Sequence, residues 1–125
     1  MTARMPDPEL LRAFGRAIRQ NLEEQIAKER EAAAARRAIV VPLVREAVAR
    51  ARAEGLCEAV WLFGSYAWGE PGERSDVDIF VEGRRDTIAI ASRVGRACGL
   101  DVHVVDSVEA PESLRQRVHA EGKLL

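Results

Sequence analysis

The sequence predicts an α/β protein, in which a small mixed β-sheet is flanked by helices and a long helix lies at the N-terminal end. Two observations predict the sheet. Residues 60–63 are all apolar, which is typical of a strand covered on both faces, and residues 76–81 alternate between polar and apolar side chains. The third observation is an apolar stripe at three- and four-residue steps from residue 11 onward, which predicts an amphipathic helix.

The long helix is expected over residues 8–37. Asp7 is a good N-cap residue, and Pro8 suits the first helical position. Charged residues fill the faces outside the apolar stripe. Two interpretations stay open: an extension that lies over the domain with a solvated outer face, or a surface for a second copy or another protein. The stripe consists of Leu11, Phe14, Ile18, Leu22 and Ile26.

Pro42 predicts a break in this helical pattern, because proline lacks an N–H and disfavours helix at the preceding residue. A second helix is expected over residues 43–53, with Gly55 just beyond its end. The sequence therefore predicts an N-terminal helical extension over residues 1–42 and a domain over residues 43–125.

Gly64 and Ser65 follow the first strand directly. Glycine has no Cβ, so its backbone can approach a ligand closely or turn with a positive φ. Ser65 adds a hydroxyl and a main-chain N–H. If a short helix begins here, its free N–H groups would face a phosphate group.

Asp76 and Asp78 lie on the second strand, on the opposite face from its apolar residues. Their positions are roughly 6–7 Å apart along a strand that rises about 3.3 Å per residue. Two carboxylates this close repel each other unless a cation lies between them, and such oxygen ligands suit Mg²⁺ or Mn²⁺. The intervening segment 70–75 contains Pro-Gly and predicts a turn, which Ser75 is expected to cap.

The rest of the chain predicts a helix over residues 87–98, a strand over residues 100–105 and a last helix over residues 112–121. In the strand, alternation places Asp101 and His103 on one face and the valines on the other. The Arg36–Arg37 pair and the Arg84–Arg85 pair are candidates for phosphate contacts, although such pairs are usually solvated. Tyr66 or Trp68 could stack on a base, but core packing is expected for at least one of them.

Composition is that of one ordinary globular domain of 125 residues with net charge −1, so no basic field indicates nucleic acid. Residues 1–55 carry eleven Lys or Arg against eight acids, whereas residues 56–125 carry eight against twelve. The second part therefore suits a cation site. Neither a secretory signal nor a membrane-length apolar run is present, which predicts a cytoplasmic protein whose Cys57 and Cys98 are reduced, small buried side chains.

One string of residues resembles a known signature. Phe63-Gly64-Ser65-Tyr66-Ala67-Trp68-Gly69, with ten residues between Ser65 and Asp76-x-Asp78, resembles the motif of the DNA polymerase β-type nucleotidyltransferase superfamily. The residues of this string and the small size of the chain resemble the minimal nucleotidyltransferase branch of the superfamily. That branch includes antitoxins paired with HEPN-domain toxins. The resemblance covers roughly residues 43–121 and implies the polymerase β-like fold.

The resemblance implies a magnesium-dependent enzyme that moves an NMP from an NTP, expected to be ATP, to a hydroxyl group. The acceptor would be a partner toxin protein or an RNA 3′ end, and the protein would be the antitoxin of the pair. Asp76 and Asp78 would hold the metal ion, and Gly64 with Ser65 would fix the phosphates. Asp101 is the candidate for the superfamily's third carboxylate, although alignment on the segment from Glu112 places His103 there.

Two other functions stay open. The protein could be a catalytically weak or inactive antitoxin that acts by forming a complex through its long helix. It could also resemble small-molecule enzymes such as aminoglycoside nucleotidyltransferases. The chain has no obvious second domain for an acceptor pocket, which two copies could build together.

Overall fold

A computed structural model describes residue 5 and residues 7–125, which divide into two compact units, residues up to Ala32 and residues from Ala33 to Leu125. The structure confirms a mixed α/β fold with a long N-terminal helix. Among the described residues, no helix has the length and apolar content that crossing a bilayer requires. The elements are α1 (Pro8–Ala53), β1 (Cys57–Phe63), α2 (Ser65–Trp68), β2 (Val77–Arg85), α3 (Thr87–Cys98), β3 (Val102–Asp106), α4 (Glu112–Glu121) and β4 (Lys123–Leu124).

The first unit consists of the N-terminal part of α1. Asp7 caps this helix as expected, because its Oδ1 accepts a hydrogen bond of 2.9 Å from the Glu9 N–H. The apolar stripe is present and exposed to solvent, with Phe14 at 65% exposure. The side chains that share this exposure are Leu11, Phe14, Ile18, Leu22 and Ile26.

The expected break at Pro42 is wrong, because α1 continues through this residue to Ala53. Proline removes one hydrogen bond, to the carbonyl of residue 38. Ala38 and Pro42 are both exposed, so water can solvate the freed carbonyl group. On the other side of the helix Val44 and Val48 are fully buried, and their burial offsets the lost bond. The expected boundary between residues 42 and 43 stays a prediction.

The sheet has four strands in the order β3-β2-β1-β4. β1 pairs antiparallel with both β2 and β4, and β2 pairs parallel with β3 through the helical crossover α3. The C-terminal strand β4 pairs Leu124 with Trp61, which extends the three strands that the sequence predicts. Two residues are too few to show a strand pattern, so only tertiary pairing reveals this edge.

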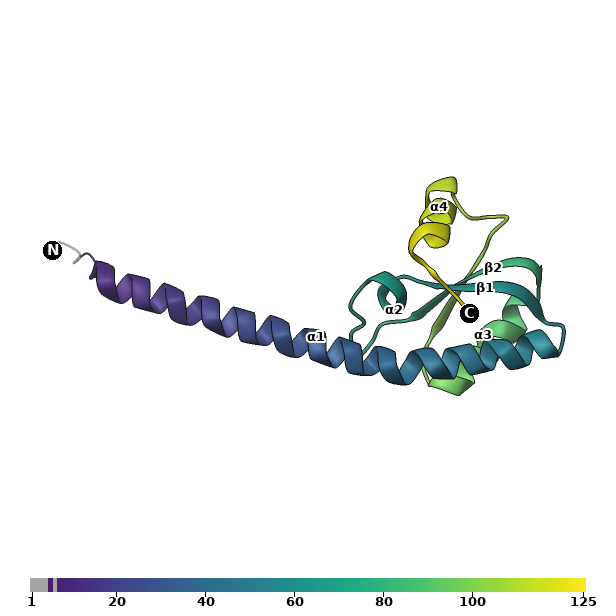
Figure 1. Ribbon diagram of the computed structural model, residues 1–125, viewed down its shortest axis with the longest axis horizontal. Coiled ribbons are helices and arrows are strands. Elements are labelled where there is room, and N and C mark those ends of the chain that lie inside the picture. Colours follow the sequence, from purple (N-terminus) through teal and green to yellow (C-terminus); the bar gives the residue numbers. More distant parts are fainter. Residues whose placement is uncertain (1–4, 6) are drawn as a thin grey trace. The chain divides into compact units, whose positions relative to one another are not determined.

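Helices lie on both faces of the sheet (Figure 1), and an apolar cluster packs on each face. On one face, α3 and the second half of α1 bury Ile79, Val81 and Ile90 completely. On the other face, α4 covers Phe80 and contributes Val118. The expected inward positions of Ile79 and Val81 are therefore confirmed, and the sheet is buried on both sides at its centre.

The central strand β2 has apolar side chains that are fully buried on both faces of the sheet. We expect Ile79→Ala to lower the free energy of unfolding by about 2–5 kcal/mol, because the cavity cannot collapse between two layers. Ile88→Ala should change it by less than about 0.5 kcal/mol, since Ile88 is 82% exposed. Urea unfolding of both variants measures the difference. Equal losses in the two variants would contradict the packing described above.

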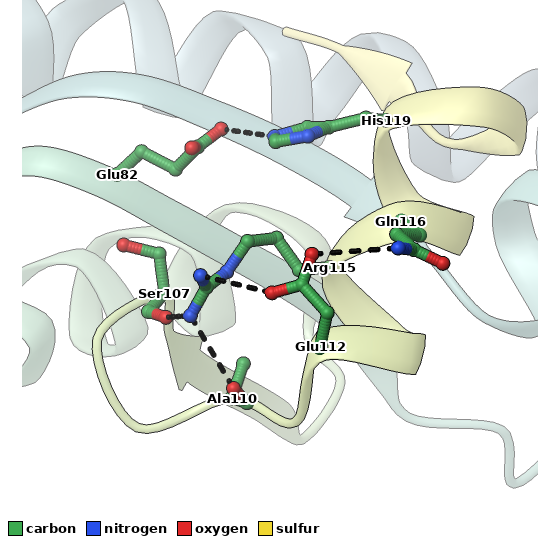
Figure 2. A network of polar contacts seen from close by, with 7 residues as sticks. All are labelled: Glu82, Ser107, Ala110, Glu112, Arg115, Gln116 and His119. Atoms are coloured by element: carbon green, nitrogen blue, oxygen red, sulfur yellow. Dashed lines mark hydrogen bonds and ion pairs between the residues drawn. The ribbon is translucent and has the colours of Figure 1, made fainter.

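Two polar groups attach α4 to the sheet (Figure 2). The Arg115 guanidinium donates to the main-chain carbonyls of Ser107 and Ala110, at 2.7 and 3.4 Å, which fixes the turn before the helix. Further along the helix, the His119 Nε2 lies 2.8 Å from the Glu82 carboxylate of β2. These contacts hold α4 over the face that carries Asp78.

The cysteines behave as small buried side chains. Both are free, Cys57 is buried and Cys98 is partly buried. Burial raises the pKa of the Cys57 thiol, so it stays protonated at neutral pH. The expected burial is confirmed for Cys57, whereas Cys98 is only partly buried.

Candidate active site

Gly64 forms the bend between β1 and α2. Its φ of 72° and ψ of −151° lie in a region that is essentially open only to glycine. The Gly64 carbonyl accepts hydrogen bonds from the N–H groups of Ala67 and Trp68, both at 3.0 Å, and so begins the short helix α2. Ser65 is the first residue of α2, as expected, and its N–H has no acceptor within that helix.

Asp78 lies directly beside this bend. The pairing of Phe63 with Asp78 brings the start of β2 next to the end of β1. A Cβ placed on Gly64 would overlap Oδ2 of Asp78 and lie 3.1 Å from its Cγ. Glycine at position 64 therefore makes room for this carboxylate, and the two halves of the expected site meet.

The two aspartates differ in their surroundings. β2 begins at Val77, so Asp76 lies in the last position of the loop and is exposed, whereas the Asp78 side chain is 24% exposed. Burial raises the pKa of Asp78, the nearby His103 opposes this effect, and the charge of Asp76 adds to it. The Asp78 carboxylate is therefore the more desolvated of the two and would gain more from a bound cation.

The two candidates for the third position, Asp101 and His103, lie differently relative to Asp78. Asp78 pairs with His103, and the His103 Nδ1 lies 3.4 Å from the Asp78 Oδ1. Asp101 precedes the strand, where its main-chain carbonyl accepts the Val77 N–H at 2.9 Å and its side chain is exposed. The structure thus brings His103 against Asp78 and leaves Asp101 outside that contact.

Within residues 5 and 7–125, no three Asp, Glu, His or Cys side chains gather into a group that could hold a metal ion. Magnesium does not require such a group, since it commonly binds one or two carboxylates and takes its other ligands from substrate phosphates and water. Asp76 and Asp78 supply two hard oxygen donors, and Gly64 keeps the space beside Asp78 free of a Cβ. The residues present therefore fit a magnesium ion that arrives with a triphosphate.

The loop between α2 and β2 is held by side chains of α1 as well as by its own turn. Ser75 caps its turn, as expected, by accepting the Gly72 N–H at 2.8 Å. Arg36 of α1 donates to the Pro71 carbonyl, and Arg37 donates to the Gly69 carbonyl. The sequence alone does not predict these two contacts. These two guanidinium groups bind main-chain carbonyls of the loop, in place of the phosphate contacts considered for them from the sequence.

Other candidate ligand contacts turn out to be structural. Tyr66 is 2% exposed and belongs to the core. The Arg117 guanidinium covers one face of the Trp68 ring at 4.2 Å. Arg85 forms an ion pair of 2.6 Å with Asp106, the last residue of β3.

Comparisons with known proteins identify the family of this chain. Residues 50–125 match the family model described as polymerase beta, nucleotidyltransferase. A chain of a toxin–antitoxin complex crystallised with AMP-PNP is 29% identical, with a TM-score of 0.51 over 63% of this chain and 69% of that one. A candidate minimal nucleotidyltransferase is 28% identical, with a TM-score of 0.47 over 78% of this chain and 96% of that one.

A third solved structure contains a tri-AMPylated HEPN toxin of Shewanella oneidensis in complex with its MNT antitoxin. It is 28% identical, with a TM-score of 0.41, over 71% of this chain and 67% of that one. No curated protein sequence matches the chain significantly.

Proposed function

Because the chain belongs to the polymerase beta nucleotidyltransferase family, we propose that it transfers a nucleoside monophosphate from an NTP to a hydroxyl group. The observation that carries the proposal is the close approach of Asp78 to the Gly64 bend. It places the turn that we propose to bind phosphate beside Asp78, one of the two acids that we propose to bind the metal ion. ATP is the proposed donor, since a similar toxin–antitoxin chain was crystallised with its analogue AMP-PNP.

In this proposal, Gly64 and the N–H groups that begin α2 bind the phosphates, and Ser65 adds its hydroxyl. Asp76 and Asp78 would hold Mg²⁺ or Mn²⁺, which would neutralise phosphate charge in the reaction. The acceptor oxygen bonds to the α-phosphorus while the bond to the pyrophosphate oxygen breaks. The chain's own residues therefore fix the triphosphate so that attack can occur in line.

The acceptor hydroxyl must lose its proton to a base, and the candidates lie on β3 or directly before it. Asp101 and His103 are the two candidates on this side of the strand, and the contact of His103 with Asp78 favours His103. We expect His103→Gln to lower kcat about 10²-fold and Asp101→Asn to lower it less than about 3-fold. Steady-state rates of nucleotide transfer compare them. If Asp101→Asn lowered kcat more than His103→Gln does, Asp101 would be identified as the base.

The proposed acceptor is a hydroxyl-bearing side chain of a HEPN-type toxin, which would make the protein an antitoxin. Support comes from the similar chain of a toxin–antitoxin complex. The test is intact-mass measurement of a co-expressed toxin, where the expected result is an added nucleotide. An unmodified toxin combined with a lengthened RNA 3′ end would instead identify RNA as the acceptor.

A second candidate function is neutralisation by contact alone, and the exposed stripe of α1 favours it. If this is correct, Ile18→Glu should weaken capture of the toxin at least about 10-fold, since a charge enters the apolar contact. Ala27→Glu is the matched control on the opposite face of the helix, and we expect no change. Toxin capture that survives Ile18→Glu would exclude the stripe as the interface.

A further inference from the structure

The loop that separates the two halves of the site is anchored to α1 by two consecutive arginines. Arg37 donates through Nη2 to the Gly69 carbonyl, and Arg36 donates through Nη1 to the Pro71 carbonyl at 3.2 Å. Arg36 also lies 3.6 Å from the Glu73 carboxylate. One rigid helix thus contacts the loop at three successive places.

These arginines lie within the same compact unit as the loop, and both are half-buried. The Arg37 Nε is buried and has no hydrogen-bond partner. Burying a guanidinium with one donor unpaired is unfavourable, so the contact with Gly69 must offset that cost for the arrangement to persist. A lysine would supply a positive charge but could not reproduce the planar guanidinium.

Hydrogen bonds within and next to the loop involve Gly69, Gly72 and Ser75. Gly69 ends α2 and donates its N–H to the Ser65 carbonyl at 3.2 Å. Gly72 and Ser75 bond to each other through the Gly72 N–H and the Ser75 hydroxyl, and through the Ser75 N–H and the Gly72 carbonyl. Asp76 follows immediately, so a shift of this loop would move the exposed carboxylate relative to Gly64.

We propose that Arg36 and Arg37 are positioning residues that fix the loop and thereby set the placement of Asp76 relative to the Gly64–Ser65 turn. Arg37 holds the end of α2, and Arg36 holds the middle of the loop. Neither residue needs to touch the substrate. The consequence for catalysis rests on the nucleotidyltransferase function proposed above, whereas the anchoring of the loop does not.

The first test measures the loop itself by hydrogen exchange and mass spectrometry. In Arg37→Gln, the peptide over residues 69–76 should exchange about 10-fold faster than in the wild type, because the bonded amides of Gly69, Gly72 and Ser75 open more often. A peptide from α3 should be unchanged. Arg50→Gln is the matched control, since Arg50 pairs only with Glu46 on the same helix among the interactions described. Equal exchange in Arg37→Gln and Arg50→Gln would overturn the proposal.

The second test measures nucleotide transfer by the same variants. We expect Arg37→Gln to lower kcat about 10–100-fold with a smaller change in KM, because misplaced groups lower the rate after binding. Arg37→Lys should fall between this variant and the wild type. Faster exchange with an unchanged kcat would refute the positioning role while leaving the enzyme function intact.

The two proposals can fail separately. If the wild type transfers no nucleotide, the proposed function fails, and hydrogen exchange still decides whether the arginines hold the loop. If Arg37→Gln does not fold, Arg36→Gln provides the decision with the same two readouts, because its side chain is 31% exposed and its removal leaves the core intact. Unchanged hydrogen exchange of the loop in a folded Arg36→Gln variant would then overturn the proposal that the arginines fix the loop.

Discussion

An Asp78→Asn variant should lose nucleotide transfer by about 10³-fold or more and still fold like the wild type. The carboxylate is the half-buried member of the acidic pair and lies against the Gly64 bend. Asparagine keeps the shape but removes the negative charge that would hold a divalent ion. Transfer of labelled ATP to a co-purified acceptor, with Mg²⁺ present, measures the loss.

Although Asp78→Asn should lose activity, we expect it to lose no stability. Burial raises the pKa of Asp78, so the folded state binds its proton more tightly than the unfolded chain does. The folded protein therefore loses stability as the pH rises from the unfolded-state pKa through the raised pKa of Asp78, and the cost is fully present above that raised pKa. We expect the Tm of Asp78→Asn at pH 7 to equal or exceed that of the wild type.

Asp86→Asn is the matched control for this experiment. Asp86 caps α3 by accepting the Ala89 N–H at 3.1 Å, and asparagine caps a helix equally well. This variant should keep both stability and transfer. An Asp78→Asn protein that transfers nucleotide as well as Asp86→Asn does would show that the acidic pair is not catalytic.

Local sequence patterns predict most of the elements of this fold. The apolar run at residues 60–63 and the alternation from Val77 to Val81 define the two central strands because their period follows from backbone geometry. Gly99 ends α3 with a φ of 70°, as expected for a residue beyond a helix. Pro42 misleads because a propensity of one residue is outweighed by the burial of Val44 and Val48 on the same helix.

In the site, too, local patterns predict some features, whereas others depend on contacts that only the folded structure reveals. The motif predicts that Gly64 and Asp78 converge, since they lie at adjacent ends of paired strands. It cannot choose between Asp101 and His103, because both alternate to the same face and only the register of β3 separates them. The contacts of Arg36 and Arg37 with the loop join residues more than 30 positions apart, and no local pattern encodes them.

Gly64→Ala should disable the protein by two separable effects. The backbone at residue 64 adopts a conformation that costs alanine about 1–3 kcal/mol of folding free energy. In addition, the new Cβ would overlap the Asp78 carboxylate and force it away from the Gly64–Ser65 turn, which we propose to bind phosphate. We expect both a lower Tm and a loss of transfer of about 10²-fold or more, because small displacements of reacting groups have large effects on rate.

Gly99→Ala separates the backbone effect from the overlap. Gly99 also has a positive φ, but nothing lies within 4 Å of the position that its Cβ would occupy. This variant should lose about 1–2 kcal/mol of stability and none of its transfer activity. The difference between the two glycine variants then measures the contact with the carboxylate.

A double-mutant cycle completes the argument. In an Asp78→Ala background, the carboxylate that a Cβ at residue 64 would meet is gone, so Gly64→Ala should destabilise the protein less than it does in the wild type. Urea unfolding of the four proteins gives the coupling between the two positions. Additive losses would mean that residue 64 and residue 78 do not touch, and the single pocket for phosphate and metal would have to be abandoned.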